Sequence, residues 1–287
     1  MRINFLKVYN MEIMEIIKDA FVFPSQNLEK LVIYIVLTFV MGLFIAGGII
    51  SGIFGAMDNS LYFVLTAILA IIAICIAFII SGYQIGVIKT GIDQVDDAPG
   101  FDWINNLVTG IKALIVSIVY FIIPAIIIAI VALVTNIPGQ IADIAQQAVV
   151  SPANTTAVAS GASPIATISD AAMASLMGSI AITGIIALVL IIIFAFLATM
   201  ANARLANTGS LSEAVNIVEA FKDITRIGVG KVIAVILLSI IVVAVIQGIL
   251  GYLYGQVPQL SIIGVIVTPY LTFFTNRVTG LLYSDIA

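Results

Sequence analysis

Long runs without a charged residue constrain this chain more than any other feature of its sequence. A helix needs about 20 mostly apolar residues to cross the hydrocarbon core of a bilayer. The run Val232–Asn276 is 45 residues long, enough for two such helices, and Gly255 and Pro258 near its middle are typical turn residues. Together the uncharged runs predict six membrane-spanning helices, at residues 31–56, 61–88, 113–136, 172–200, 231–253 and 260–280.

The composition excludes a soluble globular protein. Hydrophobic residues make up 62% of the 287 residues and charged residues only 9%, whereas soluble domains average about 45–50% and about 25%. The net charge of −4 gives no electrostatic support for a nucleic-acid partner. The chain has no histidine and one cysteine, Cys75, so histidine-based catalysis, histidine-ligated metals and an internal disulfide are also excluded.

The positive charges predict how the helices are oriented. All 11 lysines and arginines fall on the side of the predicted spans that carries the N-terminus, at Arg2, Lys7, Lys18, Lys30, Lys89, Lys112, Arg204, Lys222, Arg226, Lys231 and Arg277. The opposite side carries only acidic residues, Asp58, Asp143 and Asp170. Because lysine and arginine concentrate in cytoplasmic loops, we predict a multi-pass protein of the cell membrane with both termini in the cytoplasm.

Three amphipathic segments on the basic side indicate an internal repeat. Met11–Phe23, Phe101–Lys112 and Leu211–Arg226 place apolar residues at the helical i, i+3, i+4 spacing, and each precedes an odd-numbered span. We predict an all-α fold whose single membrane domain consists of three helical hairpins, each entered through an interfacial elbow helix. The domain covers residues 1–287, and its hairpins cover about 11–88, 100–200 and 211–283. Alternatively, the segments reflect a general tendency of cytoplasmic loops to be amphipathic.

Each of these segments has a polar face opposite its apolar residues. In the second segment, Ile104, Val108 and Ile111 are predicted to face lipid or the helix bundle, together with Phe101 and Leu107. The polar faces consist of Glu12, Glu15 and Asp19 in the first segment, Asp102, Asn105, Asn106 and Lys112 in the second, and Glu213, Asn216, Glu219 and Lys222 in the third.

The exterior loop at residues 136–170 differs from the rest of the chain. Its central part, Ser151–Pro164, consists of small polar residues that bury too little surface to fold alone, so we predict that it is mobile. Pro138–Val150 is predicted to form a short helix. Asn154-Thr155-Thr156 matches the acceptor motif for N-glycosylation, on the face where that modification occurs.

The predicted span cores contain no acidic or basic residue, and this excludes several kinds of intramembrane enzyme. Aspartyl proteolysis needs two buried carboxylates, zinc proteolysis needs an HExxH motif, and serine proteolysis needs a basic partner such as histidine. We therefore expect no enzymatic activity, no catalytic residues, no cofactor and no metal site. Cys75, within an apolar stretch of the second span, is expected to serve packing only.

The two prolines within the predicted spans have two interpretations. Pro124 and Pro269 remove a backbone donor and either kink a helix for packing or open it toward a solute. The polar side chains that would line such a path are Gln84, Gln247, Tyr120, Thr268, Tyr270 and Thr272.

Close helix packing is indicated by the pairs Gly48/Gly52, Gly82/Gly86 and Gly251/Gly255. Interfacial anchoring is typical of Trp103, Tyr83, Tyr252, Tyr254 and Tyr283. Asp93, Asp96, Asp97 and Asp102 form an acidic cluster that we interpret as a solvated face.

Residues 82–124 carry a resemblance to a known family. The pattern consists of Gly82-Tyr83, Lys89, Pro99, Phe101-Asp102-Trp103, Gly110, Lys112, Tyr120 and Pro124, in that order. It is similar to that of an uncharacterised family of prokaryotic, largely archaeal, integral membrane proteins, domain of unknown function four-zero-one-three, in which the F-D-W segment is the recognisable core. The resemblance implies several hydrophobic spans and adds no activity.

Two functional classes fit these observations. The first is a non-enzymatic scaffold or partner subunit, which works with the lipid bilayer and with another membrane protein or a second copy of itself. The second is a small permease or channel subunit for an uncharged or amphiphilic solute. A polar cavity lined by Gln84, Gln247, Tyr120 or Thr272 would favour the second class.

Overall fold

The computed structural model describes residues 11–57, 60–150 and 169–287. Within these ranges all regular secondary structure is helical, as predicted. Six segments are long and apolar enough to cross a membrane: α2 (Leu28–Met57), α3 (Leu61–Ile92), α4 (Trp103–Val134), α7 (Asp170–Thr208), α10 (Val229–Gln256) and the segment Pro258–Tyr283. The last consists of the 3₁₀ helix η1 (Pro258–Ile263) and α11 (Gly264–Tyr283). The six predicted spans are confirmed, and the chain is an all-α multi-pass membrane protein.

The chain forms two compact units. Unit 1 consists of residues 1–117 and 197–287, and unit 2 consists of residues 118–196. Unit 2 contains the short helix α5 (Ile137–Val150), which confirms the helix predicted there. In this unit Gln140 at the start of α5 donates hydrogen bonds to the Thr135 carbonyl and the Ser179 hydroxyl, both at 2.9 Å, and so ties α5 to α7. The predictions for Ser151–Pro164 and Asn154 lie outside the described residues.

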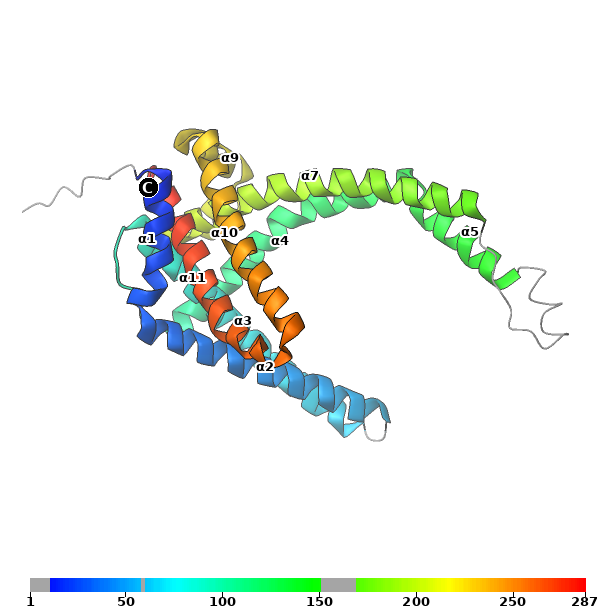
Figure 1. Ribbon diagram of the computed structural model, residues 1–287, viewed down its shortest axis with the longest axis horizontal. Coiled ribbons are helices and arrows are strands. Elements are labelled where there is room, and N and C mark those ends of the chain that lie inside the picture. The colour runs from blue at the N-terminus through cyan, green and yellow to red at the C-terminus, as the bar shows by residue number, and fades with distance from the viewer. Residues whose placement is uncertain (1–10, 58–59, 151–168) are drawn as a thin grey trace, which may run out of the picture. The chain divides into compact units, whose positions relative to one another are not determined.

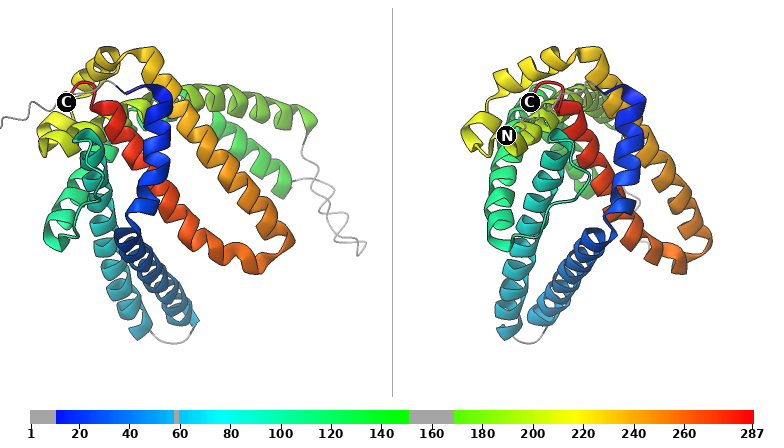
Figure 2. Two further views of the ribbon diagram at one scale, coloured as in Figure 1. Left: turned by 60° about the vertical axis from the view of Figure 1, so that its left-hand side comes forward. Right: turned by 90° about the vertical axis from the view of Figure 1, so that its left-hand side faces the viewer.

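Unit 1 contains two hairpins, one of α2 and α3 and the other of α10, η1 and α11. Helix α1 (Ile13–Gln26) lies beside α11, and the two hairpins approach each other where α3 meets α11 (Figure 1). The end of α2 and the start of α3 stand apart from the turn between α10 and α11 in each view (Figure 2). An aromatic core fills the junction and includes Phe23, Tyr34, Tyr83 and Phe273.

Glycines allow the closest helix crossings in unit 1. A Cβ added at Gly280 of α11 would lie 2.7 Å from the Cα of Gly91 on α3 and would overlap the Ile88 carbonyl. Helices α3 and α4 cross in the same way, because Gly82 lies against the Asn106 backbone and Gly110 against the Phe78 backbone. Such contacts are typical of small residues at membrane helix interfaces.

Two of the three predicted elbow helices are separate helices. The first is α1, and the third corresponds to α8 (Leu211–Ala214) and α9 (Ile217–Ile227), which precede α10. The second prediction was wrong as a separate element: Trp103–Lys112 forms the first turns of the continuous helix α4. No glycine or proline interrupts the chain between Gly110 and Pro124, so nothing in this stretch ends the helix.

Helix α1 buries its apolar face, whereas α4 and α9 each bury a polar residue and expose an apolar one. In α4, Asn106 is buried at the crossing with α3, whereas Ile104 is 77% exposed. In α9, Asp223 is fully buried and Phe221 is 59% exposed. Lipid solvates apolar side chains well, so the protein interior can be the more polar side of a membrane helix.

Candidate functional site

Arg277 of α11 is the centre of a buried cluster. Its side chain is only 1% exposed and donates from Nε to Asp19 of α1 at 2.8 Å. Its Nη1 donates to the carbonyls of Thr90 at 2.9 Å and Val95 at 2.6 Å, and the guanidinium lies 4.6 Å from the centre of the Phe23 ring. One side chain therefore joins α1, the end of α3 and the following loop to α11.

A second buried cluster joins α7 to α9 and α11. The guanidinium of Arg204 donates to the Asp223 carboxylate at 2.8 Å and to Glu213 at 2.7 Å. The Tyr283 hydroxyl donates to the same oxygen of Asp223 at 3.0 Å, and Arg226 donates to the other at 3.1 Å. Asp223 thus has three hydrogen-bond donors, as a buried carboxylate requires.

Lysines extend these contacts over the basic side of unit 1. Lys89 on α3 donates to Asp93 at 2.8 Å and to Asn207 on α7 at 3.4 Å, and Lys112 on α4 donates to the Gly209 carbonyl at 2.8 Å. Lys231 pairs with Asp285 at 2.5 Å.

On the exposed face of α9, the hydrogen bond from Lys222 lowers the pKa of the Glu219 carboxyl, and the charge of Arg226 lowers it further. These surface contacts are screened by solvent and stabilise the structure less than the buried clusters do.

A polar cavity lies among α3, α4, α7 and α11 within unit 1. Its volume is about 320 Å³. Its polar lining residues are Ser81, Gln84, Ser117, Asn202 and Asn276, and none of the described residues that line it is charged. The Oδ1 atom of Asn202 is buried and has no hydrogen-bond partner in the protein. Three amides and two hydroxyls from four helices therefore surround one space.

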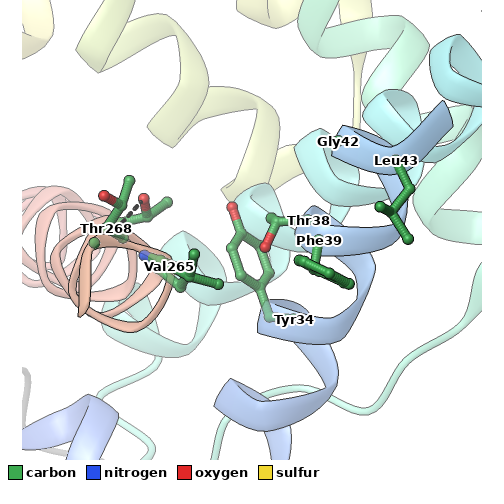
Figure 3. A pocket seen from close by; sticks show the side chains of 10 residues that line it. Tyr34, Thr38, Phe39, Gly42, Leu43, Val265 and Thr268 are labelled. Carbon is green, nitrogen blue, oxygen red and sulfur yellow. Dashed lines mark hydrogen bonds between the residues drawn. The ribbon is translucent and has the colours of Figure 1, made fainter. Parts of the chain in front are cut away.

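A second, mostly apolar groove of about 390 Å³ separates α2 from α11. Figure 3 shows Tyr34 and Thr38 of α2 on one side and Val265 and Thr268 of α11 on the other. Pro269 has no N–H, so the Val265 carbonyl lacks its usual helical donor at this groove. Gln84 donates to the Tyr34 hydroxyl at 2.7 Å, and this bond joins a lining residue of the polar cavity to one of the groove.

The F-D-W segment shapes the junction between α3 and α4. The ring of Phe101 stacks on Tyr83 with centroids 4.0 Å apart, and the Tyr83 hydroxyl donates to the Pro99 carbonyl at 3.1 Å. Asp102 accepts a hydrogen bond from the Asn105 N–H at 3.1 Å, in the first turn of α4. Within the family pattern, Tyr83 and Phe101 therefore pack beside the crossing of α3 and α4 that Gly82 and Gly110 allow.

A family model covers most of the spans that build this site. It matches residues 65–255 and is described as "Protein of unknown function (DUF4013)". The chain belongs to this family. The DUF4013 match includes the cavity residues on α3, α4 and α7, while Asn276 and Arg277 on α11 lie beyond it. No curated protein and no solved structure matches the chain.

The structure separates the side chains that were predicted as a polar path. Gln84 lines the polar cavity, Thr268 and Thr272 line the groove, and Tyr270 donates to the Phe21 carbonyl. Gln247 is exposed on α10 and lines neither space, and Tyr120 is fully buried.

The glycine pairs also differ. Gly82 and Gly86 meet other residues closely, Gly48 and Gly52 make ordinary contacts, and a Cβ at Gly251 or Gly255 would meet no described atom within 4 Å.

Three other predictions need correction. Tyr83 and Tyr283 are buried and hydrogen-bonded, so they are not interfacial anchors, whereas Tyr252 and Trp103 are exposed. Cys75 is exposed, so it does not lie in the core of the described protein.

The acidic residues Asp93, Asp96, Asp97 and Asp102 are all exposed, as the interpretation of a solvated face predicts. Three of them also have partners, because Asp93 pairs with Lys89, Asp96 with Arg277, and Asp102 caps α4. Among the described residues, no three cysteine, aspartate or glutamate side chains are placed to hold a metal ion.

Sequence reasoning missed the amides Asn202 and Asn276 and the buried carboxylate Asp223. Each stands one to three residues from an arginine near the end of a predicted span or elbow helix. The available signal was a polar residue close to an arginine near the end of a span. A charged side chain at that depth needs polar partners, so such a pair indicates a buried polar site.

Proposed function

We propose that this DUF4013 protein is a non-enzymatic scaffold or partner subunit of the cell membrane, with its basic side in the cytoplasm. The carrying observation is how unit 1 is held together. Buried ion pairs centred on Arg277 and Arg204 join its helices on the basic side, while the end of α2 and the start of α3 stand apart from the turn between α10 and α11 on the other side (Figure 2). Such a frame holds apolar helix surfaces in fixed positions.

The exposed surfaces support this proposal. In each span, only 11% to 22% of the residues in the most apolar stretch are buried. The groove lies between α2 and α11, which meet at the ring contact of Tyr34 with Phe273, and its wall is apolar apart from a few hydroxyls. Tight packing of another membrane helix there would add van der Waals contacts that mobile lipid tails provide less well.

Photo-crosslinking in native membranes tests the scaffold proposal. A photoreactive amino acid at Phe39, in the groove, should give a protein adduct of one defined mass, which is twice the chain mass if the partner is a second copy. The control position is Ile71, which is 61% exposed on α3 and lines neither space; it should give lipid adducts only. Lipid adducts alone at both positions would contradict the proposal.

A permease for an uncharged solute is the second candidate, and the polar cavity favours it. Gln84, which lines that cavity, is one of the side chains that such a path would use. Farther from the basic side, however, residues 61–76 of α3 offer only Tyr62 and Thr66 as hydroxyl groups. Proteoliposomes that swell in glycerol faster than protein-free liposomes would support the permease, and equal rates would support the scaffold.

A further inference from the structure

We infer that the polar cavity among α3, α4, α7 and α11 binds an uncharged polyhydroxyl group, such as a sugar or glycerol. This inference does not depend on the scaffold proposal, because a scaffold and a permease could each hold such a group. The cavity of about 320 Å³ lies at the lower end of the range of ligand pockets, which is about 300–1,000 Å³.

The lining chemistry selects a neutral group. The polar lining consists of the amides Gln84, Asn202 and Asn276 and the hydroxyls Ser81 and Ser117. An ion in this space would lose its hydration without gaining a counter-charge from the described lining, and that cost is large. A neutral ligand that hydrogen-bonds avoids it.

Asn202 belongs to the wall of the cavity, and its orphan Oδ1 would accept from a ligand hydroxyl if the side chain turned toward the space. Its Oδ1 is buried without a partner, whereas its neighbours in the cavity are amides that both donate and accept. Ser117 donates to the Ala113 carbonyl at 3.0 Å, which leaves its oxygen as an acceptor. A hydroxyl group donates and accepts at one atom, so several hydroxyls on one ligand match a lining that offers both donors and acceptors.

The depth of the cavity matches the headgroup region of one leaflet. Asn202 and Asn276 stand two residues and one residue from Arg204 and Arg277. Gln84 precedes Lys89 by five residues, which is about 7 Å along a helix. The cavity therefore lies just inside the level of the basic residues, where a sugar or glycerol headgroup of a lipid would be found.

The basic end of the cavity is bordered by two lysine contacts. Ile88 and Ala113 line the space, and the residues beside them, Lys89 and Lys112, reach the end of α7 at Asn207 and Gly209. These bonds hold α7, and with it Asn202, against α3 and α4. The ligand can come from the bilayer as a lipid headgroup or from water as a free polyol.

Binding is tested with the full chain in phosphatidylcholine nanodiscs that contain no sugar detergent. The probes are a glucosyl diacylglycerol, the same diacylglycerol without sugar, and free methyl glucoside. We expect the glucosyl lipid to appear bound in native mass spectra and to raise Tm, while the sugar-free lipid does neither. Stabilisation by methyl glucoside as well would show that the free polyol also binds.

Variants locate the site. Asn202→Leu removes the orphan oxygen and fills the cavity, and should weaken sugar binding at least about tenfold, because polar groups of the ligand lose their partners. Ser81→Val is a milder change in the same cavity and serves if Asn202→Leu does not fold. Gln247→Leu replaces an exposed amide outside the cavity and should bind as the wild type does. No binding of either sugar probe by the wild type, or equal binding by all variants, would overturn the inference and leave the cavity to water.

Discussion

At residue 277 a single guanidinium joins segments that are far apart in the sequence. Replacing Arg277 with Met removes the partner of Asp19 and the side-chain donor to the carbonyls of Thr90 and Val95, of which Thr90 keeps the Val95 N–H at 2.9 Å. Breaking a buried ion pair from one side is strongly destabilising, and we expect the free energy of unfolding to fall by about 3 kcal/mol. Unfolding in mixed micelles, followed by circular dichroism, measures this loss.

Lys30→Met is the matched control for this residue. It also removes one basic side chain on the same side of the spans, but the one ion-pair partner of Lys30 among the described residues is the neighbouring Glu29, whose side chain is 81% exposed. Exposed pairs contribute about 0–1 kcal/mol, so its effect should lie in that range. If the two variants lost equal stability, the Arg277 cluster would not be what fastens α1 to α11.

At the scale of the element, the crossing of α3 and α11 depends on two glycines. In Gly280→Ala the new methyl group would overlap the Ile88 carbonyl and approach the Gly91 Cα to 2.7 Å. The helices must separate to admit it, and overpacking of this kind costs about 1–3 kcal/mol. We expect a lower Tm in detergent.

Gly251→Ala provides the comparison for the crossing. No described atom lies within 4 Å of its added Cβ, and alanine favours a helix over glycine by about 1 kcal/mol in water. Its Tm should therefore equal or exceed that of the wild type. A Gly280→Ala protein as stable as Gly251→Ala would mean that the backbones of α3 and α11 do not need this close approach.

A structural feature can be predicted from the sequence when the residues that determine it lie within one segment. The six spans follow from uncharged runs, because a bilayer selects helix length and polarity within one segment. Asp19 and Asp223 instead pair with arginines that are 258 and 19 residues away, and no local pattern reports such distances. The prediction that Asn106 lies on the water-facing side of α4 was wrong. Polar residues of a helix face outward where the surroundings are water, whereas they face the protein interior where the surroundings are lipid.

At the scale of the whole molecule, the orientation in the membrane is the main open prediction. All the described lysines and arginines lie at the same ends of the spans, close to α1, α8 and α9. The opposite ends carry only acidic charges, such as Asp170 at the start of α7. Lysine and arginine near the ends of spans are held back in the cytoplasm during insertion, and this asymmetry predicts that α9 is cytoplasmic and the start of α7 is exterior.

Labelling of single cysteines in a Cys75→Ala background tests this orientation directly. Asp170→Cys and Lys222→Cys both replace exposed residues, and neither belongs to a buried cluster. A membrane-impermeant maleimide added to intact cells should label position 170 at once and position 222 only after the cells are permeabilised. Because both sites are water-accessible in the folded chain, the membrane is the barrier that distinguishes them. Labelling of position 222 alone in intact cells would contradict the predicted topology and show that the basic side is exterior.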